Sequence, residues 1–260
     1  MKKCIIGCGK VGTALGSYLG ITPTKNIEET KNANIIFIAT PDSKIKEVYE
    51  QIKTYLANNH ISKGSLEANF PLVPTLSDGS FSDGIASIAS GKIIFCHMSG
   101  FLASDLFKDN IGFSIHPMAA VTKETDLKKI MFTIEGDSKH IHIIKELFPN
   151  NQIIKKEAKP LYHAAAVIAS NFLVGIYNIA ENVLKEAGIQ NTEMLMGLVE
   201  TTINNIKSKG SINALTGPIE RGDLETVKSH LEALPENYKD IYNVMSNQLI
   251  KIAIQKNIDK

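Results

Sequence analysis

Three glycines near the start of the chain have the spacing of a dinucleotide-binding loop. The segment Gly7 to Gly12 (GCGKVG) matches G-x-G-x-x-G, follows a short apolar run and opens a helix-like stretch. In such a loop the first glycine permits a tight turn, the second admits a pyrophosphate, and the third lets helix pack on strand, with the helix N-terminus facing the phosphates. A glycine-rich turn that binds nothing is the alternative. The expected cofactor contacts here are Gly7, Gly9, Lys10, Val11 and Gly12.

Three later apolar runs each end in a polar cluster, namely Thr40-Pro41-Asp42, His97-Met98-Ser99-Gly100 and His116-Pro117-Met118. Ligands of open α/β sheets bind outside the carboxyl ends of the strands, so these clusters predict a cleft. We expect Thr40, Pro41, Asp42 and Ser99 to contact the cofactor. Taken alone, Asp42 is more typical of an N-cap for the helix that follows. His116 and His97 either contact a ligand or are core histidines bonded to the backbone.

Polar residues also interrupt an apolar helical segment, Leu161 to Ala187. His163 and Ser170 are seven residues apart and therefore share one helix face, with Asn171 beside them. The helix dipole disfavours an imidazolium in the first turn, which favours a neutral His163 able to exchange a proton. The alternative is that His163 bonds locally and Asn171 bonds to a neighbouring helix. We expect His163, Asn171 and His116 to handle the substrate's proton and carbonyl, with Ser170 as a substrate contact.

The connector Ala214 to Asp223 (ALTGPIERGD) carries one further candidate. Asp223 is expected to cap the helix Leu224 to Leu234. Arg221, between a proline turn and that cap, is expected to pair with an anionic substrate, and a solvated arginine is the alternative.

The elements that must position these residues fall into two groups. In the first half, short β-branched and aromatic runs alternate with helix-like stretches, which is typical of a mostly parallel sheet covered by helices. The expected strands are Lys3–Gly7, Asn34–Thr40, Lys92–His97, Gly112–His116 and Lys129–Ile134. After Pro160, which suits the first helical turn, the pattern is helical throughout, with Gly188 ending the first helix. The expected helices are Leu161–Ala187, Thr192–Lys209, Leu224–Leu234 and Glu236 to about Lys256.

The fold class predicted is therefore α/β, with a Rossmann-like N-terminal domain (1–157) and an all-helical C-terminal domain (158–260). A turn-rich stretch between Asn58 and Gly91 is expected to form a long loop. Only Gly20 to Ala33 separates the first helix from the next strand, so the second strand of a complete mononucleotide fold is expected to be missing or vestigial. This shortens the adenosine side, so cofactor affinity is expected to be weak or lost. Lys25 is the basic candidate there for a 2′-phosphate.

Composition excludes several classes of function. With 28 Lys+Arg against 27 Asp+Glu the formal charge is +1, which argues against a nucleic-acid or anionic-membrane surface. The longest uninterrupted apolar stretch, Ala164 to Ala169, is far shorter than the ~20 residues of a membrane span, and no secretory signal is evident, so a cytoplasmic protein is expected. Cys4, Cys8 and Cys96 are odd in number and lie in apolar segments, which indicates reduced, buried thiols and no metal site.

These motifs together resemble one family, the Rossmann-like oxidoreductases whose helical C-terminal half is a domain of unknown function. The segments that carry the resemblance are Gly7–Gly12, Ile38–Asp42, His97–Gly100, Ser114–Met118, Tyr162–Asn171 and Ala214–Asp223. The chain is more distantly similar to pyrroline-5-carboxylate reductases, ketopantoate reductases, deazaflavin-dependent NADP oxidoreductases and 6-phosphogluconate-type dehydrogenases. In the dehydrogenases a Lys and an Asn one helical turn apart act on the substrate. Here the Lys is taken to be absent, with His163 in its neighbourhood.

The resemblance implies NAD or NADP binding, hydride transfer and a helical domain that dimerises. The function expected is an NAD(P)-dependent oxidoreductase acting on a small, anionic hydroxy or imino substrate in a cleft between the domains. The apolar helix Leu161 to Ala187 is expected to be buried centrally and to help form a homodimer. The alternative is a non-catalytic ligand-binding or sensor protein that kept the fold but lost dinucleotide chemistry.

Overall fold

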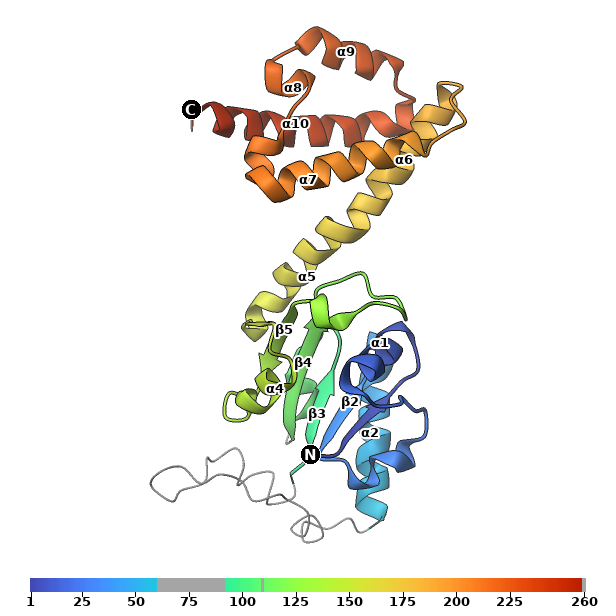
Figure 1. Ribbon diagram of the computed structural model, residues 1–260, viewed down its shortest axis with the longest axis vertical. Coiled ribbons are helices and arrows are strands. Elements are labelled where there is room, and N and C mark those ends of the chain that lie inside the picture. Colours follow the sequence, from blue (N-terminus) through green and yellow to red (C-terminus); the bar gives the residue numbers. More distant parts are fainter. Residues whose placement is uncertain (60–91, 109, 259–260) are drawn as a thin grey trace. The chain divides into compact units, whose positions relative to one another are not determined.

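The structure is a computed structural model that describes residues 1–59, 92–108 and 110–258 (Figure 1). It divides into two compact units, Met1–Ile168 and Ala169–Lys260, and each is described below by itself. The boundary expected at 157/158 precedes the helical run, whereas the two units divide inside that run. Apart from its first two residues, the predicted long loop between Asn58 and Gly91 lies outside the described residues.

The first unit is built on a six-stranded sheet in the order β1-β2-β3-β4-β5-β6, parallel except for the β4–β5 pair (Figure 1). The strands are β1 (Lys3–Ile6), β2 (Ile35–Ile38), β3 (Ile94–His97), β4 (Ile111–Pro117), β5 (Phe132–Gly136) and β6 (Asn151–Ile153). All five predicted strands are confirmed, and β6 was not predicted because its sequence, Asn-Gln-Ile, has no apolar run. The parallel register brings the carboxyl ends of β1 to β4 to one edge of the sheet.

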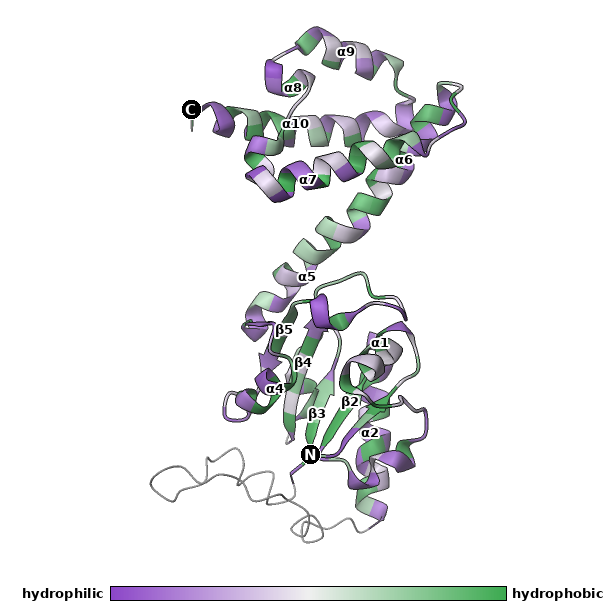
Figure 2. Ribbon diagram, in the orientation of Figure 1, coloured by the Kyte–Doolittle hydropathy of each residue, from purple (hydrophilic) through white to green (hydrophobic). Residues whose placement is uncertain are grey.

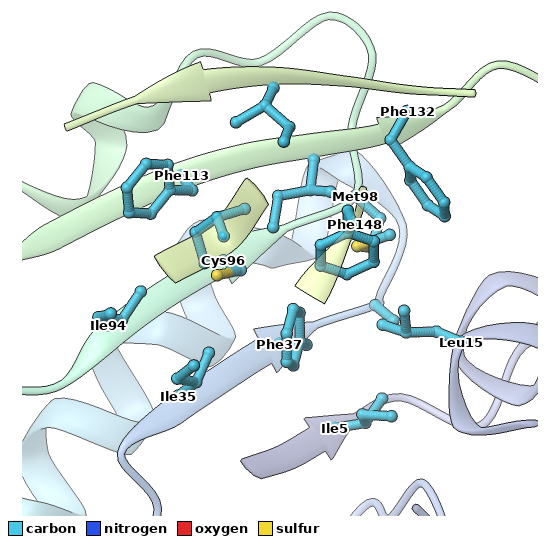
Figure 3. Packing of buried hydrophobic residues seen from close by; sticks show 14 of the residues in the cluster. Ile5, Leu15, Ile35, Phe37, Ile94, Cys96, Met98, Phe113, Phe132 and Phe148 are labelled. Carbon is cyan, nitrogen blue, oxygen red and sulfur yellow. The ribbon is translucent and has the colours of Figure 1, made fainter. Parts of the chain in front are cut away.

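Both faces of the sheet are covered, which explains the continuous apolar runs. Successive strand residues point to opposite faces. Ile35 and Phe37 therefore join the core beneath α1 (Lys10–Leu19) and α4 (Ile141–Leu147), shown in Figure 3, while Ile36 and Ile38 pack with Tyr49 of α2 (Asp42–Asn58). Three 3-10 turns follow β3 in this unit: η3 (Ser104–Phe107), η4 (Leu127–Lys129) and η5 (Lys156–Ala158).

The predicted loss of the second strand is confirmed. Between α1 and β2 the chain makes a single parallel bridge, Ile6 to Thr24, followed by a 3-10 helix, η1 (Ile27–Asn32). Two backbone hydrogen bonds hold Thr24 beside β1. The Thr24 N–H donates to the Ile5 carbonyl (2.9 Å), and the Gly7 N–H donates to the Thr24 carbonyl (2.8 Å). On the adenosine side, a single bridging residue, Thr24, therefore takes the place of the second strand.

The predicted long helix is confirmed as a continuous helical run with a change of pitch inside it. It comprises α5 (Lys159–Val167), a π-helical turn (Ile168–Phe172) and α6 (Leu173–Glu186). Pro160 lies in its first turn and Gly188, with a φ of 80°, follows its end, both as predicted. The remaining helices are α7 (Met194–Ala214), α8 (Pro218–Arg221), α9 (Leu224–Ala233) and α10 (Glu236–Ile258).

The second unit has almost no interior of its own. Only Ser246 and Ala253, both on α10, are buried among its described residues, whereas Val174 of α6 is 70% exposed and Leu198 of α7 is 64% exposed. Figure 2 shows that apolar residues recur along α6 and α7, among polar ones. The expectation that the first long helix is buried centrally is therefore wrong for the single chain, because much of the apolar surface of α6, as at Val174, is exposed among the described residues.

One further expectation, that no helix spans a membrane, stays a prediction, and another, about the cysteines, needs correction. The run Lys156–Glu186 is long and apolar enough, at a mean hydropathy of 1.4, to cross a membrane by length and composition alone, although no uninterrupted apolar stretch of that length exists in the sequence. A helix covered by another protein surface has the same length and composition. Cys4 and Cys96 are buried as expected, but Cys8 is exposed because it lies in the glycine loop, outside the sheet's core.

Candidate functional site

The glycine loop has the geometry that a pyrophosphate requires. Gly7 has a φ of 122°, and a Cβ built on it would lie 2.4 Å from the Ala39 carbonyl oxygen. A Cβ on Gly12 would lie 1.8 Å from the Gly7 carbonyl oxygen, so only glycine allows α1 to pack this closely. A Cβ on Gly9 would meet no atom within 4 Å. Space is therefore open in front of Gly9, on the side from which a phosphate would approach.

The start of α1 offers hydrogen-bond donors to that space. Gly9 makes no side-chain cap and the first turn carries no acidic residue. The first bond of the helix joins the Thr13 N–H to the Gly9 carbonyl (2.9 Å), so the N–H groups of Lys10, Val11 and Gly12 have no acceptor within the helix. Thr40 Oγ1, beside the loop, is buried without a hydrogen-bond partner in the described part of the chain. Unpaired donors around an open space fit a dinucleotide pyrophosphate.

Asp42 and Ser99 bind each other. Pro41, rather than Asp42, is the N-cap of α2, so the predicted capping role of Asp42 is wrong. Its Oδ2 instead accepts a hydrogen bond from Ser99 Oγ (2.6 Å), which also accepts bonds from the N–H groups of Phe101 (3.1 Å) and Leu102 (2.9 Å). A hydroxyl has one donor and two acceptor positions, so that of Ser99 is fully used. The pair ties the loop after β3 to the start of α2.

Lys159, at the start of α5, is a candidate site residue that sequence reasoning missed. It is 1% exposed, and its Nζ donates to Ser114 Oγ (2.6 Å) and to the Ser99 carbonyl (3.4 Å). Burial lowers its pKa to about 8, opposed by the charges of Glu135 and Asp42. A lysine therefore does stand on this helix, one turn before His163. The available signal was their spacing of four residues, which places both on one helix face.

His116 and His163 lie together, as the sequence predicted. Their ring centroids are 6.1 Å apart, and the ring of Phe101 lies 6.3 Å from that of His163. The backbone of Gly100 packs against both imidazoles, because a Cβ there would lie 2.7 Å from His163 Cδ2 and 3.0 Å from His116 Nε2. Burial, followed by the charges of His163 and Lys159, lowers the pKa of His116 to about 4. His116 is therefore neutral at physiological pH.

His97 belongs to the core. The Ser99 N–H donates to its Nδ1 (3.2 Å), so Nε2 carries the proton and donates to the Ala103 carbonyl (3.2 Å). Burial lowers its pKa to about 4. Of the two alternatives considered for His97, the structure supports a buried histidine bonded to the backbone, which shapes the loop that carries Gly100.

The other predicted site residues lie in the second unit. Ser170 Oγ donates to Asn171 Oδ1 (2.9 Å) within the π-helical turn, and Arg221 ends α8. Their roles at the site stay predictions. Asp223 caps α9 as predicted, accepting from the Thr226 N–H (3.1 Å). In the part of the chain that the structure describes, no three His, Cys, Asp or Glu side chains gather where they could hold a metal ion.

Comparison with known proteins agrees with this fold. Residues 130–249 match the family described as a domain of unknown function, DUF2520, so the resemblance found in the sequence is confirmed. No curated protein matches the chain.

Solved structures share the architecture over nearly the whole chain. A protein of Thermotoga maritima has a TM-score of 0.72 at 23% identity, covering 98% of this chain and 99% of its own. A protein of Bacteroides fragilis described as a candidate NADP oxidoreductase has a TM-score of 0.68 at 17% identity, covering 96% and 98%. A Plasmodium falciparum pyrroline carboxylate reductase with NADP bound has a TM-score of 0.52 at 12% identity, covering 97% and 98%. At these identities the likeness shows the fold: a Rossmann-like sheet followed by a helical domain.

Gly100→Ala tests the packing of the two imidazoles. The added methyl group must displace the rings of His163 and His116, which we expect to lower the free energy of unfolding by about 1–3 kcal/mol and to shift both imidazole NMR signals. Gly9→Ala is the matched control, because its methyl group meets no atom. Unchanged imidazole signals in Gly100→Ala would contradict the geometry described.

The buried histidines also predict a pH dependence of stability. In the unfolded chain His97 takes up a proton near pH 6.5, whereas the folded chain resists protonation until about pH 4. The contribution of neutral His97 to the free energy of unfolding is therefore complete above pH 6.5 and is lost as pH falls toward 4. Urea unfolding should show about 2 kcal/mol less stability at pH 5 than at pH 7.5 for each such histidine. His97→Gln should remove one such increment, and an identical pH dependence would contradict the assignment.

Proposed function

We propose that this protein is an NAD(P)-dependent oxidoreductase that acts on a small substrate. The observation that carries the proposal is the glycine loop, whose unpaired N–H groups border open space at the sheet edge that also bears the His116, His163 and Lys159 cluster. When bound, the nicotinamide supplies or accepts a hydride at the substrate carbon. Gly7, Gly9 and Gly12 hold the pyrophosphate, and Thr40, with its unpartnered hydroxyl, contacts the cofactor beside them.

The residues around the imidazoles take distinct roles in this proposal. His163 is partly exposed and exchanges the substrate's proton. Lys159, with a pKa of about 8, is mostly charged at pH 7 and places a positive potential beneath the site, which favours an anionic substrate. Because its Nζ is buried, Lys159 acts through the residues that it positions. Ser99 and Asp42 hold the loop that carries Gly100.

The preference for NADP or NAD is assigned to Lys25. Thr24 forms a parallel bridge with Ile6 of β1, so the chain there has the same direction as β1. Lys25, the next residue, therefore lies at the same sheet edge as the glycine loop. Lys25 is exposed, and an exposed ammonium there suits a 2′-phosphate. We therefore propose NADP, bound weakly because the adenosine side is only one residue wide. The fold shared with the NADP-bound reductase of Plasmodium falciparum supports this cofactor class.

Dinucleotide titration tests the proposal directly. Calorimetry should show NADPH binding to the wild-type protein, with at least a tenfold loss of affinity in Gly9→Val, because the side chain fills the space the pyrophosphate needs. Thr54→Val, at an exposed position on α2 away from the glycine loop, is the control and should leave binding unchanged. Failure of the wild type to bind either dinucleotide would overturn the proposal. Binding without NADPH oxidation by any 2-oxo acid or cyclic imine would support the non-catalytic alternative.

We further propose that a second copy of this chain covers the apolar faces of α6, α7 and α10. A groove of about 280 Å³ runs between α6 and α10, lined by apolar side chains that include Ile176, Val183 and Met245. A unit with so little buried surface needs a partner for stability. Asn178 and Asn182 interrupt α6 and bond to each other, which suits a protein interface better than lipid.

The oligomeric state tests this second proposal. Light scattering at micromolar concentration should give twice the chain mass, and Ile176→Asp should shift the protein toward monomer because it buries a charge in the interface. Ile153→Asp is the matched control, since Ile153 has the same 41% exposure but lies on β6 of the first unit. A monomeric wild type that binds lipid vesicles would contradict the dimer and favour a membrane surface.

A further inference from the structure

The imidazole of His116 is held from one side by the hydroxyl of Tyr162, which the hydroxyl of Thr133 supports in turn. Its Nδ1 lies 2.6 Å from Tyr162 OH, and Thr133 Oγ1 donates to the same phenol oxygen at 2.9 Å. Thr133 is buried, Tyr162 is partly buried, and all three residues belong to the first unit. No described residue makes a hydrogen bond to the other ring nitrogen, Nε2, which lies beside Gly100 and the ring of His163.

Counting protons fixes the tautomer of this imidazole. Tyr162 OH accepts from Thr133 and has one proton to donate, either to His116 Nδ1 at 2.6 Å or to Met118 Sδ at 3.6 Å. A thioether is a weak acceptor, and an imidazole nitrogen at the shorter distance is a strong one. Burial raises the pKa of Tyr162, so the phenol keeps its proton. The proton therefore points at Nδ1, which leaves the imidazole's own proton on Nε2.

We propose that Tyr162 and Thr133 fix His116 as a neutral hydrogen-bond donor at Nε2, so that the site takes its ligand through an oxygen acceptor rather than through a protonated imino or amino group. The ligand class is thus a carbonyl, hydroxyl or carboxylate compound, which narrows the hydroxy or imino substrate of the proposed function and rests on it only for the identity of the site. A donor held in place before the reaction stabilises negative charge that develops on such an oxygen.

The surrounding charges act in the same direction. His163 and Lys159 face His116 and disfavour its protonation, and Asp42 opposes them from α2. Asp42 is already bound to Ser99, which limits its pull on a ligand. A cationic ligand group would meet an N–H donor, a neighbouring imidazole and a buried ammonium, whereas an oxygen acceptor meets one fixed donor.

The tautomer is measurable in the full-length protein without any cofactor. Long-range ¹H–¹⁵N spectra of histidine-labelled protein at pH 7 should show His116, assigned by its loss in His116→Gln, with the proton on Nε2. His97 serves as an internal reference, because the Ser99 N–H already requires the proton of that ring to be on Nε2. A spectrum of His116 with the proton on Nδ1 would overturn the proposal.

Variants test whether this relay, the hydrogen bonds from Thr133 to Tyr162 and from Tyr162 to His116, fixes the tautomer rather than general packing. Tyr162→Phe should lose the fixed tautomer and give a mixture of the two neutral forms, and Thr133→Val should weaken the preference. Tyr18→Phe is the matched control, because it removes a hydroxyl that bonds to the Leu147 carbonyl (2.9 Å) and should leave the His116 signals unchanged. A Tyr162→Phe variant that is folded and retains the wild-type His116 pattern would contradict the relay.

The ligand class is tested with two small probes of opposite chemistry. Acetate, added to tens of millimolar, should shift the Nε2 proton signal of His116, and methylammonium at the same ionic strength should not. No shift with acetate, or a shift with methylammonium alone, would overturn the assignment of an oxygen acceptor. Because no readout uses a dinucleotide, failure here is distinguishable from failure to bind NADPH.

Discussion

The arrangement of the candidate site depends on the hydrogen bonds of one buried ammonium group, that of Lys159. Removing a charge from water costs several kcal/mol unless hydrogen bonds replace the lost solvation. Ser114 Oγ and the Ser99 carbonyl supply those bonds, and Ser114 in turn donates to the Ser99 carbonyl (3.0 Å). The start of α5 is thereby attached to the middle of β4 and to the loop after β3, which brings Tyr162 and His163 to His116.

The same charge also adds to the effect of burial on a neighbour. Burial lowers the pKa of His116 and the charge of Lys159 lowers it further, while Glu135 and Asp42 favour the charged form of Lys159. Glu135 is itself held by the N–H and hydroxyl of Ser104 (2.8 and 2.7 Å), at the start of the η3 turn. The cluster therefore combines a neutral donor, a second imidazole and a fixed positive potential within one rigid unit, which suits binding of an electron-rich ligand group.

Much of the fold follows from local sequence, and much of the site does not. Glycine spacing, apolar runs and the short Gly20 to Ala33 connection were sufficient for the loop, five strands and the lost second strand. Lys159 was missed because lysines are rarely buried and this one stands beside a helix-starting proline, so its partners 45 and 60 residues away were invisible locally. Asp42 has the position of a cap, and only the tertiary contact with Ser99 reveals its partner.

The glycine loop provides the strongest internal argument for a ligand. Gly7 and Gly12 are explained by packing, because a Cβ on either would overlap the backbone of the protein itself. Gly9 is different, since its φ of −75° suits any residue and its Cβ would meet nothing within 4 Å. Folding alone does not require glycine there. The open space beside Gly9, bordered by N–H groups without an acceptor in the helix, fits a hydrogen-bond acceptor such as the pyrophosphate of the proposed cofactor. Because the adenosine side is reduced to Thr24, the proposed cofactor is expected to bind mainly through these donors and its nicotinamide end.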